Sequence, residues 1–338
     1  MRWDEPSIRS HRLNSVLPKT AEVVRDATVT PTVIDRKTRT YRGCVYDTDG
    51  KVVPLSQRSN EIVAWQHTDP EVLPRGRARK LDRRAVYLGH YSGQYGHFLM
   101  ETLSRFWVLL DAEPFETFIF QPFVHPMRRP SEFSPAKVTF ECFGIEEDRV
   151  VYADRCFRVR ELTVPSALCA LHVGANEAQA VVYRRLASWC QTEYGSPVPG
   201  ADPLRVYVSR TKFKGHRPLV NEEDVESMFS SLGFDVIHPE HMPFHDQVNI
   251  FSRAHVVAGL TGSAMHNSVF MPEGSLAISI GHHRRNNPAA PVTNQLICDK
   301  LAHVRSGFVP FQGELIDEET KQARIDVAYL QSEIERQL

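Results

Sequence analysis

The chain has 338 residues, and its 40 Lys and Arg residues nearly balance its 41 Asp and Glu residues, so no overall field favours nucleic acid as a partner. The length corresponds to about two domains, and 42% hydrophobic residues supply a sizeable core. Six cysteines without any CxxC pair argue against a zinc knuckle or a disulfide framework and predict a reducing compartment. No apolar run in the sequence has the length of a signal-peptide core or a bilayer span, so we expect a cytoplasmic protein.

The region before residue 85 contains one short motif with two interpretations. Asp47-Thr48-Asp49 matches the DxD signature of metal-dependent sugar transferases. The same residues, followed by Gly50, lie between two β-like runs, and an Asp-Gly pair in that setting is a strong hairpin signal. We favour the turn, because three-residue motifs often match by chance.

A basic run at residues 75–84 precedes a short predicted strand at 85–88. We interpret the run as a solvated loop, with docking on an anionic membrane surface or a lipid-linked substrate as the alternative.

A glycine-rich turn after this strand leads into a predicted helix at 97–110. Its apolar positions at helical spacing are Leu99, Leu103, Phe106 and Leu110. His97, Glu101 and Arg105 recur every four residues and therefore share one side of the helix. The stripe is either solvated, with a weak Glu101–Arg105 pair, or functional, because α/β proteins place their sites at such turns.

Residues 115–194 alternate short strands with helices, which is the βαβα rhythm of a parallel sheet. We predict strands at 118–120, 150–152 and 161–164. Helices are predicted at 134–143, with Gly144 at its C′ position, and at 177–194. The Pro- and Gly-rich loop at 196–203 is the best boundary, so we expect a first domain of residues 1–195.

A second domain, residues 204–312, continues this rhythm. Strands are predicted at 204–208, 234–237, 255–258 and 275–280, and helices at 221–232, capped by Asn221, and at 243–254. Within residues 313–338, a terminal helix is predicted from 317 onward, either packed on the body or crossing back to the first domain.

Two strand ends of the second domain carry the strongest site signal. Arg210, Lys212 and Lys214 follow the first strand. The strand at 255–258 runs into a glycine turn and a helix start, with Ser263 as the expected N-cap. The unpaired N–H groups of a helix start favour anions, and ligands of open α/β sheets bind outside the carboxyl ends of the strands. These parts suit a nucleotide diphosphate.

Several other catalytic motifs do not occur in the sequence. It contains no HExxH, Gly-Lys-Ser/Thr or GxSxG, and Gly259 and Gly262 supply only part of a GxGxxG. We therefore expect no bound metal, no ATP hydrolysis and no serine hydrolase chemistry.

The order of several motifs resembles glycosyltransferase family 61. These motifs are GHFLME (96–101), YVSR (207–210), Arg217, NE (221–222), GF (233–234), HPE (238–240), QVNIF (247–251) and GLTGSAMHN (259–267) with Phe270. The resemblance covers about residues 87–281. The family includes bacterial capsular polysaccharide biosynthesis proteins, plant xylan xylosyltransferases and eukaryotic O-linked N-acetylglucosamine transferases. Thr261 stands where many members carry His, a change that leaves the backbone anion site in place.

The resemblance implies a GT-B architecture, which is an α/β fold with two Rossmann-like domains that face each other across a cleft. It also implies an inverting transferase that needs neither metal nor another cofactor. The nucleotide-sugar donor, most simply UDP-linked, belongs on residues 204–312, and a glycan or lipid-linked glycan acceptor on residues 1–195. A role in bacterial capsular or cell-surface polysaccharide synthesis follows, in the cytoplasm or peripherally at the inner face of the membrane.

The expected site residues fall into four groups. Arg210, helped by Lys214 or Arg217, and the N–H groups of Gly262, Ser263 and Ala264 bind the diphosphate. His266 and Asn267 reach the diphosphate or the sugar, although Asn267 also fits an interior polar contact. Glu240 and Gln247 contact the nucleoside, with a surface position as the alternative for Gln247. Tyr95 and Arg105 lie on the acceptor side, where Glu101 is the general base and His97 its rival.

Two alternatives remain open. One is a transferase that uses a CMP-linked sugar acid, whose leaving group carries a single phosphate. The other is a non-catalytic nucleotide-sugar-binding subunit of a polysaccharide assembly complex, against which the presence of both Glu101 and Arg210 argues.

Overall fold

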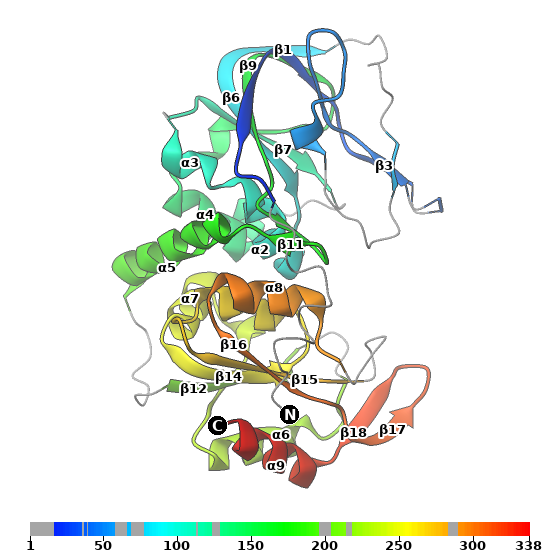
Figure 1. The fold of residues 1–338 in the computed structure, drawn as a ribbon, viewed down its shortest axis with the longest axis vertical. Helices are drawn as coiled ribbons and strands as arrows, with labels where there is room; N and C mark the ends of the chain where they lie inside the picture. Colours follow the sequence, from blue (N-terminus) through cyan, green and yellow to red (C-terminus); the bar gives the residue numbers. More distant parts are fainter. Residues whose placement is uncertain are drawn as a thin grey trace. The chain divides into compact units, whose positions relative to one another are not determined.

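The computed structural model describes residues 17–35, 37–38, 40–57, 66–68, 78–112, 114–123, 129–195, 204–213, 218–282 and 290–338. These residues form two compact units, an N-terminal unit up to Arg185 and a C-terminal unit from Leu186 to Leu338. Each unit contains a sheet with flanking helices (Figure 1). Among the described helices, none combines the length and the apolar character that crossing a membrane requires.

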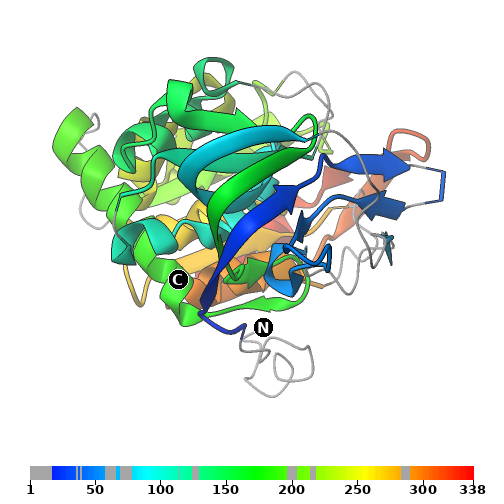
Figure 2. The same cartoon turned by 90° about the horizontal axis from the view of Figure 1, so that it is seen from above.

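The N-terminal unit is built on a six-stranded mixed sheet in the order β4-β1-β9-β6-β7-β8. The strands are β1 (Ala21–Val29), β4 (Val45–Tyr46), β6 (Arg79–Tyr91), β7 (Thr117–Pro122), β8 (Val150–Tyr152) and β9 (Phe157–Pro165). Strands β9, β6, β7 and β8 run parallel, whereas β1 pairs antiparallel with both β9 and β4. Figure 2 shows β1, β9 and β6 side by side. The predicted strands at 118–120, 150–152 and 161–164 are confirmed.

The loop prediction for the basic run is wrong for residues 79–84, and residues 75–77 lie outside the described part of the chain. Arg79, Lys80 and Leu81 pair with β9, and Arg84 lies opposite Glu161. Long basic side chains can point to solvent while their backbone completes a sheet, so charge alone did not indicate a loop.

Short elements complete this unit: β2 (Val33–Asp35), β3 (Thr40–Arg42), β5 (Gln66–His67), β10 (Cys169–Ala170), β11 (Gly174–Ala175), and the 3-10 turns η1 (Pro54–Ser56), η3 (Pro130–Glu132), η4 (Glu147–Arg149) and η5 (Glu177–Gln179). Helix α4 (Ser134–Cys142) matches its prediction, and Gly144 has a φ of 63° just after it. Helix α5 (Ala180–Tyr194), which contains the boundary between the two units, also matches its prediction. The DxD residues form the expected hairpin turn. Asp47 Oδ1 accepts the N–H groups of Asp49 (2.9 Å) and Lys51 (2.8 Å), so the turn interpretation is confirmed.

The single helix predicted at 97–110 is wrong. The segment divides into α2 (Tyr95–Met100), the 3-10 turn η2 (Thr102–Arg105) and α3 (Val108–Asp111). Arg105 Nε donates to Pro165 O (3.0 Å), and Trp107 Nε1 donates to Ser166 O (3.0 Å). These tertiary hydrogen bonds accompany the break in a segment whose apolar spacing is helical throughout.

The C-terminal unit has an all-parallel five-stranded sheet in the order β13-β12-β14-β15-β16. The strands are β12 (Leu204–Val208), β13 (Asp235–Ile237), β14 (Ala254–Leu260), β15 (Leu276–Ile280) and β16 (Arg305–Val309). Helices α7 (Phe244–Phe251) and α8 (Thr293–Leu301) cover one face, and α6 (Glu222–Ser231) and α9 (Val327–Gln337) cover the other (Figure 1). This is a doubly wound sheet, so the prediction of an α/β fold is confirmed.

Two predictions about helix starts in this unit are corrected. Asn221 occupies the predicted N-cap position of α6, but its side chain makes no capping hydrogen bond; it exchanges hydrogen bonds with the backbone of Ile325 (3.0 and 3.1 Å). The terminal helix begins only at Val327, because residues 313–325 form the hairpin β17 (Gly313–Asp317) and β18 (Gln322–Ile325). Asp326 caps α9 by accepting the N–H of Tyr329 (3.0 Å).

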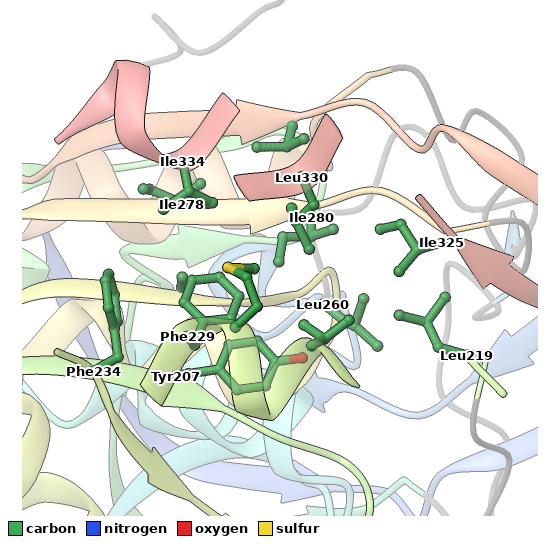
Figure 3. Close-up of a cluster of buried hydrophobic side chains, with 14 of the residues drawn as sticks. Tyr207, Leu219, Phe229, Phe234, Leu260, Ile278, Ile280, Ile325, Leu330 and Ile334 are labelled. Carbon is green, nitrogen blue, oxygen red and sulfur yellow. The ribbon is translucent and has the colours of Figure 1, made fainter. Parts of the chain in front are cut away.

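The core between the sheet and helices α6 and α9 is aromatic and aliphatic (Figure 3). Tyr207 stacks on Phe229 with ring centroids 4.2 Å apart. Leu330 and Ile334 of α9 are fully buried in the same cluster, so the terminal helix packs on the body of this unit.

We predict that Leu330→Ala lowers the free energy of unfolding by about 2–5 kcal/mol, because it removes a buried side chain and leaves a cavity. Urea denaturation followed by circular dichroism measures this change. Leu338→Ala, at the exposed end of the chain, is the matched control and should stay within about 0.5 kcal/mol of the wild type. Equal effects of the two changes would contradict the packing of α9.

Candidate functional site

The C-terminal sheet changes its winding direction between β12 and β14. When the strands are numbered along the chain, their order across the sheet is 2-1-3-4-5. The chain places β13 on one side of β12 and then places β14 on the other side. Val208 lies opposite Gly259, so the segments that follow β12 and β14 leave the same edge of the sheet. Open α/β sheets bind their ligands at this point, outside the carboxyl ends of the strands.

Two glycines allow the chain to pack closely at this edge. A Cβ atom on Gly259 would come within 2.8 Å of Met265 Sδ and 3.0 Å of Val208 Cβ. A Cβ atom on Gly262 would lie 3.3 Å from Nη1 of Arg210. The φ of Gly262 is 174°, which any residue adopts, so space and not backbone conformation favours glycine there. The predicted partners Arg210 and Gly262 are therefore brought together.

The segment after Gly262 is the 3-10 helix η7 (Ser263–Phe270). Gly262, and not Ser263, occupies its N-cap position, which corrects the predicted cap. The first N–H that bonds back to the turn is that of Met265, to Gly262 O (3.1 Å). Ser263 is exposed and Ala264 is half-buried, so the start of η7 is accessible, and the first N–H groups of a helix lack partners within it.

The residues predicted for the sugar and the nucleoside differ in accessibility. Asn267 is fully buried and donates to Gln247 Oε1 (3.2 Å), so it makes the interior polar contact that was the alternative. Gln247 is also buried and donates to the carbonyl groups of Pro239 (2.9 Å) and Met242 (3.1 Å), so the surface alternative is wrong. His266 is half-buried and Glu240 is exposed. Ligand contacts of these four residues stay predictions.

Lys214 and Arg217 lie outside the described residues. Of the three cations expected to bind the diphosphate, Arg210 lies within the described residues. Its guanidinium carbon lies 5.0 Å from the ring centroid of Phe213, which is 40% exposed.

Helix α6 supplies two carboxylates that the sequence analysis did not place at the site. Glu222 Oε1 accepts the backbone N–H of Arg210 (2.7 Å) and the hydroxyl of Tyr207 (3.3 Å). Glu226 Oε1, one turn later, accepts the hydroxyl groups of Ser209 (2.5 Å) and Thr211 (2.6 Å). Glu222 shares the buried face of α6 with Val225 and Phe229, and an acid at core spacing was the signal that could have found it.

A second buried acid, Asp299, forms a hydrogen bond with η7. Asp299 of α8 accepts hydrogen bonds from Ser268 (2.6 Å), Gln295 (2.7 Å) and Ser306 (2.7 Å). Burial raises the pKa of Asp299 to about 6, although its three donors act in the opposite direction. The group therefore joins η7, α8 and β16.

Thr261 follows the end of β14, and His282 follows the end of β15. Thr261 Oγ1 donates to Ile280 O (2.9 Å), and His282 Nε2 lies 2.9 Å from Thr261 O. Both side chains are buried, so the change to Thr at this position is accommodated by backbone partners.

The N-terminal unit brings together two of the predicted acceptor-side residues. His97 Nδ1 contacts Glu101 Oε2 directly. The side chain of His97 is 38% exposed and that of Glu101 is 11% exposed, so the imidazole is the more accessible partner. Tyr95 opens α2 and is half-buried.

Arg105 does not extend this pair along one helix face. Its guanidinium donates to the carbonyl groups of Pro165 (3.0 Å), Leu55 (2.7 Å) and Gln57 (3.4 Å). Gly89, with a φ of 77°, makes room for it, since a Cβ atom there would lie 2.7 Å from Nη1. Burial lowers the pKa of Arg105 from its usual value. These contacts give Arg105 a structural role inside the N-terminal unit. Its acceptor-side role stays a prediction.

Within the described residues, no group of three or more His, Cys, Asp and Glu side chains is arranged to hold a metal ion. The comparison with protein families identifies one domain. The model described as Glycosyltransferase 61 matches residues 95–278, which is more than half of the chain and includes both the His97–Glu101 pair and the Arg210–Gly262 edge. The search of curated proteins found no match.

We predict that the stability difference between wild type and Asp299→Asn depends on pH. The unfolded carboxyl group has a pKa of 3.8, and the folded group one of about 6. The raised value means that the folded state keeps its proton longer, so the stabilisation from this group is complete below the unfolded pKa and is lost as pH rises through the folded pKa. The free energy of unfolding of Asp299→Asn, relative to that of the wild type, should therefore be higher at about pH 7 than at about pH 4. Urea denaturation at the two pH values measures this, with the exposed Asp224→Asn as the control. A constant difference would contradict the assignment.

Proposed function

Because the chain belongs to glycosyltransferase family 61, we propose that it is an inverting, metal-independent transferase that moves a sugar from a nucleotide-sugar donor to a hydroxyl group of a glycan. That it is a glycosyltransferase follows from the family. The donor is proposed to be UDP-linked, and the C-terminal unit is proposed to bind it. The GT-B arrangement of the two units is part of the same proposal.

One observation carries the donor site. The guanidinium of Arg210 lies against Gly262 at the start of η7, where β12 and β14 end side by side. A planar guanidinium can hold two phosphate oxygens, and a helix start adds backbone N–H groups. Fixed cations and dipoles of this kind can meet the negative charge that develops on a departing diphosphate without a divalent ion.

The reaction that these parts support is a single displacement. An acceptor oxygen attacks the anomeric carbon, the bond to the diphosphate oxygen breaks, and the diphosphate leaves with the electron pair. The hydroxyl proton passes to the His97–Glu101 pair. We assign the base to Glu101, with His97 as its partner. The greater exposure of His97 supports the rival assignment, in which Glu101 orients the imidazole.

The proposed acceptor is a glycan or a lipid-linked glycan of bacterial capsular or cell-surface polysaccharide. We place the protein in the cytoplasm, free or peripheral at the inner face of the membrane. The family supports glycosyl transfer, and these finer statements extend it.

We predict that UDP stabilises the protein in the presence of EDTA. A ligand at one hundred times its dissociation constant adds about 2.7 kcal/mol of stability, which a thermal-shift assay detects. A parallel screen with CDP, CMP and other nucleotides separates a diphosphate donor from a CMP-linked one. Binding that disappears in EDTA and returns with manganese would make the metal-free mechanism wrong.

Arg210→Ala should weaken UDP binding by about 1.5–3 kcal/mol, the contribution of a charge-assisted hydrogen bond, and should change uridine binding much less. Arg305→Ala is the matched control, because Arg305 begins β16 at the amino-terminal edge of the same sheet. Equal losses for UDP and uridine would contradict a phosphate contact.

We predict that Glu101→Gln reduces turnover by about 10²–10⁴-fold and leaves UDP affinity nearly unchanged, because it keeps the shape of the side chain and removes its basicity. Turnover with an accepted donor and acceptor pair measures the loss. If Glu101→Gln stays active while His97→Ala is folded, binds UDP and is inactive, the base is His97. A protein that binds donors and transfers no sugar to any acceptor would instead be a binding subunit.

A further inference from the structure

Glu222 is a deeply buried acid at the proposed donor site. Only 1% of the residue is exposed, and it is the first residue of α6. Its Oε1 atom accepts the N–H of Arg210 and the hydroxyl of Tyr207. Tyr207 is fully buried and stacks on Phe229 (Figure 3), so this end of the carboxyl group has a fixed position.

The other oxygen of this carboxyl group has a different environment. Among the described residues, Oε2 is buried and has no hydrogen-bond partner. An ionised carboxylate with one unsatisfied oxygen in the interior is costly, whereas the neutral acid is less so. Burial accordingly raises the pKa of Glu222 to about 7, with Glu226 acting in the same direction and Arg210 and Tyr207 against it.

Within the described part of the chain, the charged and titratable groups that act on Glu222 are Arg210, Tyr207 and Glu226. Arg210 and Tyr207 approach from β12 and its end, and Glu226 approaches from the next turn of α6. His238 lies next to Glu226, with 3.9 Å between Nε2 and Oε1. Arg210 is thus the one cation that the ionised Glu222 shares with the proposed diphosphate, among the groups that the structure shows acting on it.

We propose that Glu222 is a positioning residue that holds Arg210 at the anion site and gains a proton when the diphosphate binds. This inference rests on the proposed donor site. An ionised Glu222 neutralises part of the field of Arg210, and a bound diphosphate adds negative charge on the far side of the same turn. Both effects favour the protonated acid in the complex, so donor binding and proton binding support each other.

The sign of the pH dependence follows from this coupling. Well below the pKa of the free protein, Glu222 is already protonated and affinity does not change with pH. Above that pKa, the proton must be taken from solvent, so affinity falls as pH rises, by up to about tenfold per pH unit for one coupled proton.

The test measures the affinity for UDP-glucose between about pH 6 and about pH 9 in wild type, Glu222→Gln and Glu223→Gln. Neither phosphate of this probe titrates in that range. Glu222→Gln keeps an oxygen that can accept the N–H of Arg210 but cannot ionise. It should bind at all pH values as tightly as wild type does at the lowest. Glu223→Gln, the same change at the neighbouring exposed position, should follow the wild-type curve.

Two results would overturn the inference. Glu222→Gln could keep the wild-type slope, which would assign the proton to another group. It could also bind more weakly than wild type at every pH, which would show that the charge and not the proton is required. If the variant does not fold, calorimetry of the wild type in buffers of different ionisation enthalpy decides, because the absence of proton uptake near neutral pH excludes the coupling.

Sulfate is the second probe, because it stays doubly charged over the same range and tests the anion site without a nucleotide. A sulfate affinity that falls with pH in wild type and is level in Glu222→Gln supports the inference even when no nucleotide sugar binds, an outcome that would refute the proposed function. Nucleotide-sugar and sulfate affinities that are level with pH in wild type would refute the inference and leave the proposed function intact.

Discussion

The close approach of Arg210 to Gly262 is the contact on which the proposed donor site depends. It requires β12 and β14 to lie side by side and to end at the same edge, which the parallel pairing of Val208 with Gly259 provides. It also requires the absence of side chains at Gly259 and Gly262, where a Cβ atom would meet Met265, Val208 or Arg210 itself. A cation and a helix start that are distant in the sequence are thereby brought together, where we propose that the donor binds.

Three acids support the loops at this edge, although the site is proposed to bind anions. Glu222 and Glu226 hold the turn of Arg210, and Asp299 holds η7. Each acid accepts hydrogen bonds that fix a loop, and burial raises the pKa of Glu222 and of Asp299. A buried acid that is readily protonated can fix the backbone without opposing a bound phosphate as strongly as an ionised one.

Local patterns in the sequence determined much of the secondary structure and one side of the site. Short apolar or alternating runs predicted β7, β8, β12 and β15, and longer helical patterns predicted α4, α5 and α6. The hairpin at Asp47 followed from its Asp-Gly pair. The glycine turn after β14 indicated an anion site, because a strand, a glycine and a helix start are consecutive in the chain and need no tertiary information. His97 and Glu101 were paired for the same reason, since helix geometry alone joins residues four apart.

Features that depend on distant partners were decided only by the tertiary structure. Helical spacing predicted one helix at 97–110, but Arg105 and Trp107 donate to carbonyl groups of Pro165 and Ser166, and the helix is broken. Asn221 is a residue type that often caps helices, but its side chain forms hydrogen bonds with the backbone of Ile325, which is more than one hundred residues away in the sequence. Core spacing could have indicated that Glu222 is buried, but its hydrogen-bond partners and the burial of Asp299 could not be predicted, because a carboxyl group is normally exposed and its surroundings depend on which elements pack over it. Sequence pattern fixes contacts within a few residues, whereas hydrogen bonds between separate elements exist only after the sheets and helices have assembled.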